Sequence, residues 1–267
     1  LVMGNVRRGQ LYPLCVGAER GIQAKRLAGL AEELGSKTVA HGCTAAGNDQ
    51  VRFEIVLKTL APKLEVLAPV RDHAWAREAQ LGYLESRGLP GPAAGSAYSI
   101  NRGLWGVTIG GTETLGSAQS IPESAWVLSS GALDEPAPQQ ELTIEFLRGV
   151  AVSLNGKGLD PVALIEELES LGSRFGIGRG IHLGDTILGT KGRVAFEAPS
   201  AEILLTCHRE LEKLTLSPLQ QRIKDQVSQA YGDFVHEGKQ LDPVCRDIEA
   251  LLESSQTWVS GVAHCVL

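Results

Sequence analysis

The stretch of this chain best suited to chemistry is a polar loop at 41–54, His-Gly-Cys-Thr-Ala-Ala-Gly-Asn-Asp-Gln-Val-Arg-Phe-Glu. Its small residues leave the backbone open to a ligand. Thr44, Asn48, Asp49 and Arg52 add a hydroxyl, an amide, a carboxylate and a guanidinium. Free N–H groups where a helix begins favour anions. Such a surface suits a small zwitterion or a nucleotide.

Two plainer interpretations fit the same residues. Asn48 is a good helix N-cap, and Asp49 in the first turn complements the helix dipole, so the loop also reads as a capped connection. A Cys43–His41 nucleophile pair is a further alternative, because residues two apart in a strand share a face. Nothing nearby in the sequence orients the histidine, which disfavours that alternative.

The elements around the loop predict a βαβ unit. A strand at 38–41 leads into it, a helix runs from the loop to Leu60 and stops before Pro62, and a second strand covers 65–68. A helix at 18–34, closed by Gly35, precedes them. Strand, helix and strand at this spacing indicate a parallel sheet. Ligands bind at the carboxyl ends of such strands, which is where the loop lies.

The pattern changes after a Gly- and Pro-rich segment at 88–97, so we expect one domain at 1–92 and a second at 93–267. The second domain should be α+β. A hairpin at 142–146 and 150–154 and a helix from Asp160, as its cap, to 171 come first. The segment 172–192 is Gly-rich with little periodicity. We then expect a strand at 193–196, helices at 200–214, 218–235 and 242–252, and a last strand at 257–262.

The amino-acid composition restricts the class of protein and its partners. The 267 residues are 43% hydrophobic and 21% charged, with a net charge of −6, which is ordinary for a soluble globular protein and argues against nucleic acid as a partner. No apolar run is long enough to span a bilayer. Five scattered cysteines without metal-ligand spacing suggest reduced thiols in the cytoplasm. We name no metal ligands from the sequence.

The 41–54 segment closely resembles the signature of the argininosuccinate synthase family. Further segments resemble family segments in family order: 13–20 (Pro-Leu-Cys-Val-Gly-Ala-Glu-Arg), 67–71, 98–106, 144–146, 189–193 and 196–199. The resemblance covers nearly the whole chain. It implies an α/β nucleotide-binding domain followed by a synthetase domain, assembled as a homotetramer.

The resemblance also implies a reaction. The family condenses citrulline with aspartate in arginine biosynthesis, using ATP and Mg²⁺ and releasing AMP and pyrophosphate through a citrullyl-adenylate. A ureido oxygen is a poor leaving group until it is adenylylated, after which the aspartate amine displaces AMP. Holding three ligands in line makes the catalysis largely positioning and electrostatics.

Site residues follow from the same resemblance. It places Gly42 against ATP, and Thr44, Asn48 and Asp49 on aspartate. The residues that it assigns to citrulline are Asn48, Arg52, Ser99 and Thr108. Asp185 is a candidate substitute for a family glutamate and is equally compatible with a turn residue. Thr108 stands where the family has a serine. Asp185 lies beside Gly184, which aligns with the family's citrulline-binding glutamate, and Phe196 aligns with its tyrosine.

The family opens with a strand and the segment Ser-Gly-Gly-Leu-Asp-Thr-Ser, which holds the pyrophosphate of ATP. This segment does not occur in the 267 residues, and Ser130-Gly131-Ala132-Leu133-Asp134 is a poor match because Glu135-Pro136 follows it. We therefore expect a fragment without the phosphate loop and the C-terminal tail, which has little activity alone. The alternatives are a non-catalytic remnant that binds an amino acid or a partner chain, and another ATP-pyrophosphatase.

Overall fold

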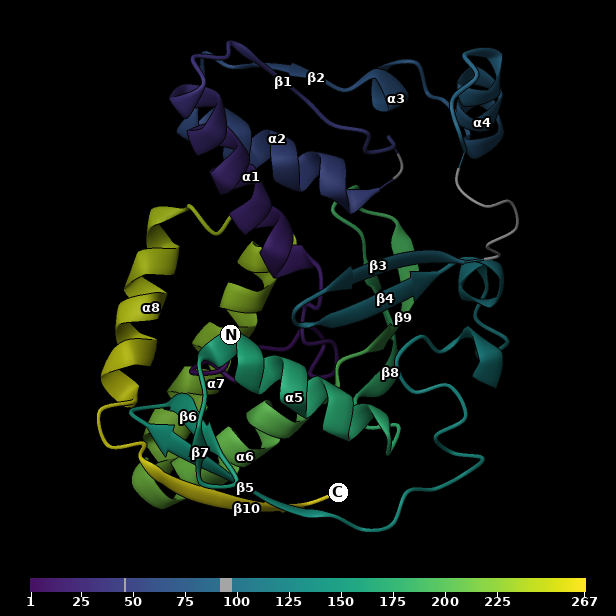
Figure 1. Cartoon of the computed structure of the whole chain (residues 1–267). Helices are drawn as coiled ribbons and strands as arrows, with labels where there is room; N and C mark the ends of the chain where they lie inside the picture. The colour runs from purple at the N-terminus through teal and green to yellow at the C-terminus, as the bar shows by residue number, and fades with distance from the viewer. Residues whose placement is uncertain (46, 92–97) are drawn as a thin grey trace.

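The computed structural model describes residues 1–45, 47–91 and 98–267, which form two units (Figure 1). The first unit holds α1 (Gly17–Glu33), β1 (Thr38–Ala40), α2 (Asn48–Leu60), β2 (Glu65–Leu67), α3 (Pro69–Asp72) and α4 (Arg77–Ser86). The second begins with β3 (Ser99–Gly103), β4 (Gly106–Gly110), η1 (Thr112–Leu115), η2 (Glu123–Ala125), β5 (Glu141–Leu147), β6 (Val150–Leu154) and β7 (Lys157–Gly158). It continues with α5 (Pro161–Ser173), β8 (Arg179–Asp185), β9 (Lys191–Glu197), α6 (Pro199–Thr215), α7 (Pro218–His236), α8 (Pro243–Ser255) and β10 (Gly261–Val266).

The first unit has the predicted βαβ arrangement. Strands β1 and β2 pair in parallel with Val39 opposite Val66, and α2 connects them. Helices α1 and α2 pack on each other, and Val39, Val56 and Leu57 are buried between them and the strands. Because α2 follows the carboxyl end of β1, its first turn and the preceding loop lie at the ligand-binding edge of the pair.

One detail of the predicted capping is wrong. The N-cap of α2 is Gly47, and Asn48 is already the first helical residue, with no side-chain bond to the helix's own N–H groups. The Asn48 amide is used by another segment, described below. Asp160 does cap α5, because its carboxylate accepts hydrogen bonds from the N–H groups of Val162 and Ala163.

The second unit is α+β, as predicted, and has two antiparallel four-stranded sheets with orders β10-β5-β6-β7 and β3-β4-β9-β8. The expected hairpin of β5 and β6 is present. The last strand, expected at 257–262, instead covers 261–266, because a turn at 256–258 follows α8 and two further residues precede the strand. Strand β8 lies within the Gly-rich segment, whose glycines interrupt the alternation of apolar and polar residues that marks a strand.

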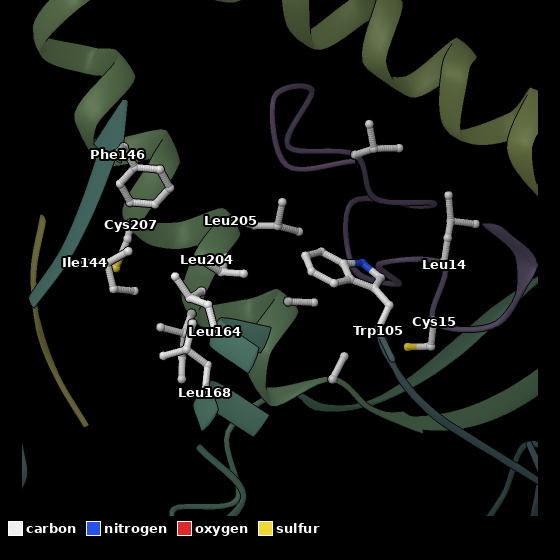
Figure 2. Close-up of a cluster of buried hydrophobic side chains, with 14 of the residues drawn as sticks. Leu14, Cys15, Trp105, Ile144, Phe146, Leu164, Leu168, Leu204, Leu205 and Cys207 are labelled. Atoms are coloured by element: carbon white, nitrogen blue, oxygen red, sulfur yellow. The ribbon is translucent and has the colours of Figure 1, made fainter. Parts of the chain in front are cut away.

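The largest core lies in the second unit, and Figure 2 shows it in close-up. Phe146 from β5, Leu164 and Leu168 from α5, and Leu204 from α6 are fully buried there. Leu14, which precedes α1, packs into the same cluster. The N-terminal segment is thus fastened to the second unit before the chain enters the first, and this holds α1 against the second unit. The expected domain boundary between 92 and 93 lies outside the described residues.

Candidate functional site

A cavity of about 750 Å³ lies between the two units. Its lining includes every site residue expected from the sequence: Gly42, Thr44, Asn48, Asp49, Arg52, Ser99, Thr108 and Asp185. These residues come from the loop before α2, from α2 itself, from the β3–β4 hairpin and from the end of β8. The fold therefore brings together segments up to about half the chain apart in sequence.

One wall of the cavity, called the α2 wall here, is formed by the first turns of α2 and the loop before it. Asp49 lies at its centre. Its Oδ1 accepts a hydrogen bond of 2.8 Å from Arg52 Nη1, and its Oδ2 accepts one of 2.9 Å from Arg20 Nε on α1. Arg20 also donates to Asn101 Oδ1 on β3 at 3.1 Å. Each carboxylate oxygen has a second lone pair, so Asp49 can still accept a hydrogen bond from an ammonium group. Two arginines fix its orientation toward the cavity.

Arg52 is buried and held by several bonds. Besides its ion pair with Asp49, its Nε donates to the His236 carbonyl at 2.8 Å, and its Nη2 lies 3.2 Å from His236 Nδ1. Burial and the neighbouring Arg52 lower the pKa of His236 to about 3, so this imidazole is neutral near pH 7. An arginine donates and cannot accept, so Nδ1 is the acceptor of that bond. The remaining N–H groups of Arg52 suit a carboxylate or a ureido oxygen.

The opposite wall is one face of the β3-β4-β9-β8 sheet. Side chains two apart along a strand share a face, and residues paired across strands share it too. Asn101 pairs with Thr108, and Thr108 with Phe196. Most lining residues of this sheet follow that register: Ser99, Asn101, Thr108, His182, Gly184, Gly192 and Val194. Asp185 and Arg193 also line the cavity, from strand positions that alternate with these.

Asn48 joins the two walls. Its Oδ1 accepts a 2.9 Å hydrogen bond from the N–H of Ile187, in the turn between β8 and β9. Its Nδ2 remains as a donor. The amide that would have capped α2 thus connects the first unit to the second across the site.

Three of the predicted residues keep accessible polar groups. Thr44 and Ser99 are exposed in the cavity wall. Asp185 is exposed as well, and its carboxylate pairs with Lys191 at 2.5 Å, which lowers its pKa. A Cβ added at Gly42 would meet no atom within 4 Å, so nothing in the described chain fills the space in front of it.

The geometry disfavours a Cys43 nucleophile. The Cys43 main-chain N–H donates to His41 Nδ1 at 3.3 Å, so this contact uses the backbone and not the thiol. Burial raises the pKa of the Cys43 thiol, and its attack requires the thiolate. The ring of His41 stacks on Phe53 instead.

Gly184 and Phe196, the two positions expected to depart from the family pattern, have crowded surroundings. A Cβ at Gly184 would lie 2.5 Å from His182 Nε2 and 3.2 Å from Arg8 Nη1, so a glutamate cannot take this position without moving them. Phe196 packs against Tyr12, with ring centroids 5.2 Å apart, and cannot donate a hydrogen bond.

Two known domain families match most of the chain. The Arginosuccinate synthase N-terminal HUP domain matches residues 2–90, and the Arginosuccinate synthase C-terminal domain matches residues 98–267. The chain belongs to the argininosuccinate synthase family. It has the family's α/β HUP domain and its C-terminal synthetase domain.

Curated argininosuccinate synthases are similar along almost all of the chain. The protein of Methanocaldococcus jannaschii is 36% identical over 256 residues, which are 96% of this chain and 65% of the relative. That of Xanthomonas campestris pv. campestris is 39% identical over 270 residues (97% and 65%), and that of Lactococcus lactis subsp. cremoris is 34% identical over 265 residues (99% and 67%). The chain thus spans about 65% of the length of the first relatives.

Sequence reasoning missed several lining residues: Arg8, Tyr12, Arg20, Asn101, His182 and His236. Tyr12 and Arg20 flank or end the family segment at 13–20, so the resemblance carried a signal for both. No sequence signal marked Arg8, His182 and His236, because they meet only through the packing of the N-terminal segment, β8 and α7.

Among the described residues no helix is long and apolar enough to cross a membrane.

Proposed function

We propose that this chain contributes the amino-acid site of an enzyme that condenses L-citrulline with L-aspartate at the expense of ATP, giving argininosuccinate, AMP and pyrophosphate. The observation that carries the proposal is the convergence of all the expected substrate residues on one cavity between the two units. The relatives that bear the name argininosuccinate synthase add further support.

We assign aspartate to the α2 wall. Thr44 and Asn48 offer a hydroxyl and an amide for its carboxylates. Asp49, oriented by two arginines, offers a carboxylate for its ammonium. Because those arginines hold Asp49 before the ligand arrives, little side-chain entropy is lost on binding.

We assign citrulline to the space between Arg52 and the sheet. Arg52 presents N–H groups that suit the ureido oxygen or a carboxylate, and Asn48 lies beside it on the first turn of α2. Ser99, Thr108 and Asp185 supply polar groups from the sheet. In this arrangement the two substrates meet near Asn48, so the aspartate amine is held close to the carbon that it attacks.

ATP fits the open side of the loop at Gly42, where a side chain would obstruct the approach of a ligand to the backbone. It supplies the adenylyl group that turns the ureido oxygen into a leaving group. Among the described residues no three His, Cys, Asp or Glu side chains are grouped as a metal site. We therefore propose that Mg²⁺ binds together with the phosphates of ATP.

Calorimetric titration of the purified chain with each amino acid tests the site. We expect Ser99→Ala to weaken citrulline binding about fivefold and to leave aspartate binding unchanged, because one hydroxyl is lost. Ser86→Ala, on α4 and bonded to the Tyr83 carbonyl, is the matched control and should change neither. A folded chain that binds neither amino acid contradicts the proposal and favours a structural remnant.

Turnover is a separate test. With ATP, citrulline, aspartate and Mg²⁺, these 267 residues should release little pyrophosphate, because they contain no Ser-Gly-Gly-Leu-Asp-Thr-Ser segment. Vigorous pyrophosphate release would show that another part of the chain holds the ATP phosphates.

We propose that the complete enzyme is a cytoplasmic homotetramer. Five free cysteines suit a reducing compartment. Leu214 on α6, Leu219 on α7 and Trp258 after α8 are exposed, and an interface between subunits would cover such large apolar side chains. Sedimentation of the complete enzyme should give the mass of four chains.

A further inference from the structure

We propose that Arg8 and His182 form a carboxylate-binding subsite over Gly184, so that the ureido substrate is held on the sheet wall by its carboxylate and not by its ammonium group. This inference rests on the proposed function and adds which chemical group of the substrate that wall recognises.

The subsite is built around Gly184. An added Cβ would point to the face that lines the cavity, and there it would meet His182 Nε2 at 2.5 Å and Arg8 Nη1 at 3.2 Å. The imidazole and the guanidinium thus occupy the space above Gly184. At a position where the resemblance places an acidic side chain, this chain presents two nitrogen groups.

Both side chains have unused hydrogen-bonding capacity. His182 is only 8% exposed, and its Nε2 has no hydrogen-bond partner among the described residues. A buried polar atom without a partner is costly, so a ligand that supplies the partner gains affinity. The ring stacks on Tyr12, with centroids 5.6 Å apart, which fixes where Nε2 points.

Arg8 has a weak partner. Its side chain is 16% exposed, and the ion pair that the described residues give it is a 3.5 Å contact with Asp233, which is itself 65% exposed. Such a pair contributes little and is easily replaced. The planar guanidinium suits a carboxylate, with which it can form two parallel hydrogen bonds.

The charges of the whole cavity favour an anion. Four arginines and two aspartates line it: Arg8, Arg20, Arg52, Arg193, Asp49 and Asp185. Asp49 is bonded by Arg20 and Arg52, and Asp185 pairs with Lys191. The excess of arginines favours a carboxylate on the sheet wall, where Asp185 already has the ammonium group of Lys191 as a partner.

Two citrulline analogues separate the contribution of the carboxylate group to binding from that of the ammonium group. In calorimetric titration of the purified chain, 5-ureidopentanoate, which keeps the carboxylate and lacks the amine, should bind within about threefold of citrulline. Citrulline amide, which keeps the amine and lacks the carboxylate, should bind at least about tenfold more weakly. An amide that binds as well as citrulline overturns the proposal.

Variants locate the effect. Arg8→Met and His182→Phe, the second of which keeps the stack on Tyr12, should each weaken 5-ureidopentanoate about tenfold and leave aspartate and ATP unchanged. Asp233→Asn is the control and should not weaken it. Thermal unfolding of each variant establishes that the chain is folded.

The outcomes are distinguishable. If Arg8→Met weakens ATP or aspartate instead, the subsite serves a different anion and the assignment is wrong. If citrulline itself does not bind the wild-type chain, the proposed function fails, and this inference fails with it. If citrulline binds and both variants bind 5-ureidopentanoate normally, only the subsite is refuted.

Discussion

At the scale of single residues, the α2 wall depends on the hydrogen bonds that Asp49 accepts from Arg20 and Arg52. Two arginines from different helices each donate to one of its oxygens, so the carboxylate is oriented and still able to accept further hydrogen bonds. Thr44, in contrast, is exposed, and its side chain stabilises little in the free protein. Substitutions at the two positions should therefore separate binding from stability.

Thr44→Val removes one hydroxyl from the aspartate side of the cavity. We expect aspartate affinity to fall about tenfold with an unchanged melting temperature, because the lost hydrogen bond is to the ligand alone. Thr59→Val, at a position on α2 where the hydroxyl bonds to the Ile55 carbonyl, is the matched control. Equal aspartate affinity in wild type and Thr44→Val would remove Thr44 from the site.

At the scale of elements, the sequence was informative where contacts are local. The spacing of Phe53, Val56 and Leu57 predicted α2, and the alternation of 142–146 predicted a strand. Strand β8 was missed because Gly180 and Gly184 interrupt its pattern; they are glycines because Phe196 and His182 fill the space beside them. These contacts depend on Phe196 from β9, on Arg8 from the N-terminal segment and on how the His182 side chain folds over β8, so local patterns cannot reveal them.

The same limit applies to the site. Thr44 and Asp49 were predictable because a continuous segment carries them. Asn48 was assigned both to the helix cap and to the substrates, and its bond to Ile187 could not be predicted from the residues around it. Arg8 and His182 meet only because the segment before α1 packs on the second unit.

The position of α2 depends on the turn after α7. Gly238 has φ +77°, and a Cβ there would lie 2.9 Å from Arg52 Cα. Gly238→Ala should therefore destabilise the chain by about 2 kcal/mol, because the added Cβ strains the backbone at positive φ and clashes with Arg52. It should also weaken citrulline binding, because Arg52 must move to relieve the clash.

Gly156→Ala provides the control for that prediction. Gly156 has φ +76°, and its added Cβ would meet nothing within 4 Å. Gly156→Ala therefore places an alanine at positive φ without a steric contact. In urea unfolding this variant should lose less stability than Gly238→Ala, and it should keep its citrulline affinity. Equal losses for the two variants would show that the contact with Arg52 is unimportant.

At the scale of the whole molecule, a buried polar network links α6, α7 and the N-terminal segment. Glu212, 3% exposed, accepts hydrogen bonds from Lys224 Nζ at 2.9 and 3.0 Å, from Asn5 at 2.6 Å and from Gln256 at 2.7 Å. Since Asn5 precedes Arg8 and Tyr12, this network also fixes the segment that reaches the cavity.

Lys224→Met leaves Glu212 as a buried charge without its ion-pair partner. We expect a loss of about 3–5 kcal/mol in the free energy of unfolding. The double variant Glu212→Gln with Lys224→Met should recover part of the loss, because the uncompensated charge is gone. Urea denaturation measures both, and a single variant as stable as wild type would contradict the role of the pair.

Buried histidines make stability depend on pH. Burial lowers the pKa values of His182, His208 and His236 below 6.5, so the unfolded chain binds these protons more readily. Their contribution is complete above pH about 6.5 and is lost as the pH falls toward their folded values. From pH 7 to 5, His236→Gln should lose less stability than wild type, by at most about 1.4 kcal/mol per pH unit. Equal pH dependence of the free energy of unfolding in His236→Gln and wild type would contradict this.

The most direct test of the central claim, that one cavity between the two units holds both amino acids, is a crystal structure of the chain with citrulline and aspartate bound. We expect aspartate beside Thr44 and Asp49, and citrulline between Arg52 and the sheet wall at Ser99 and Thr108. Occupation of any other cavity by both ligands, or the two amino acids in exchanged positions, would contradict it.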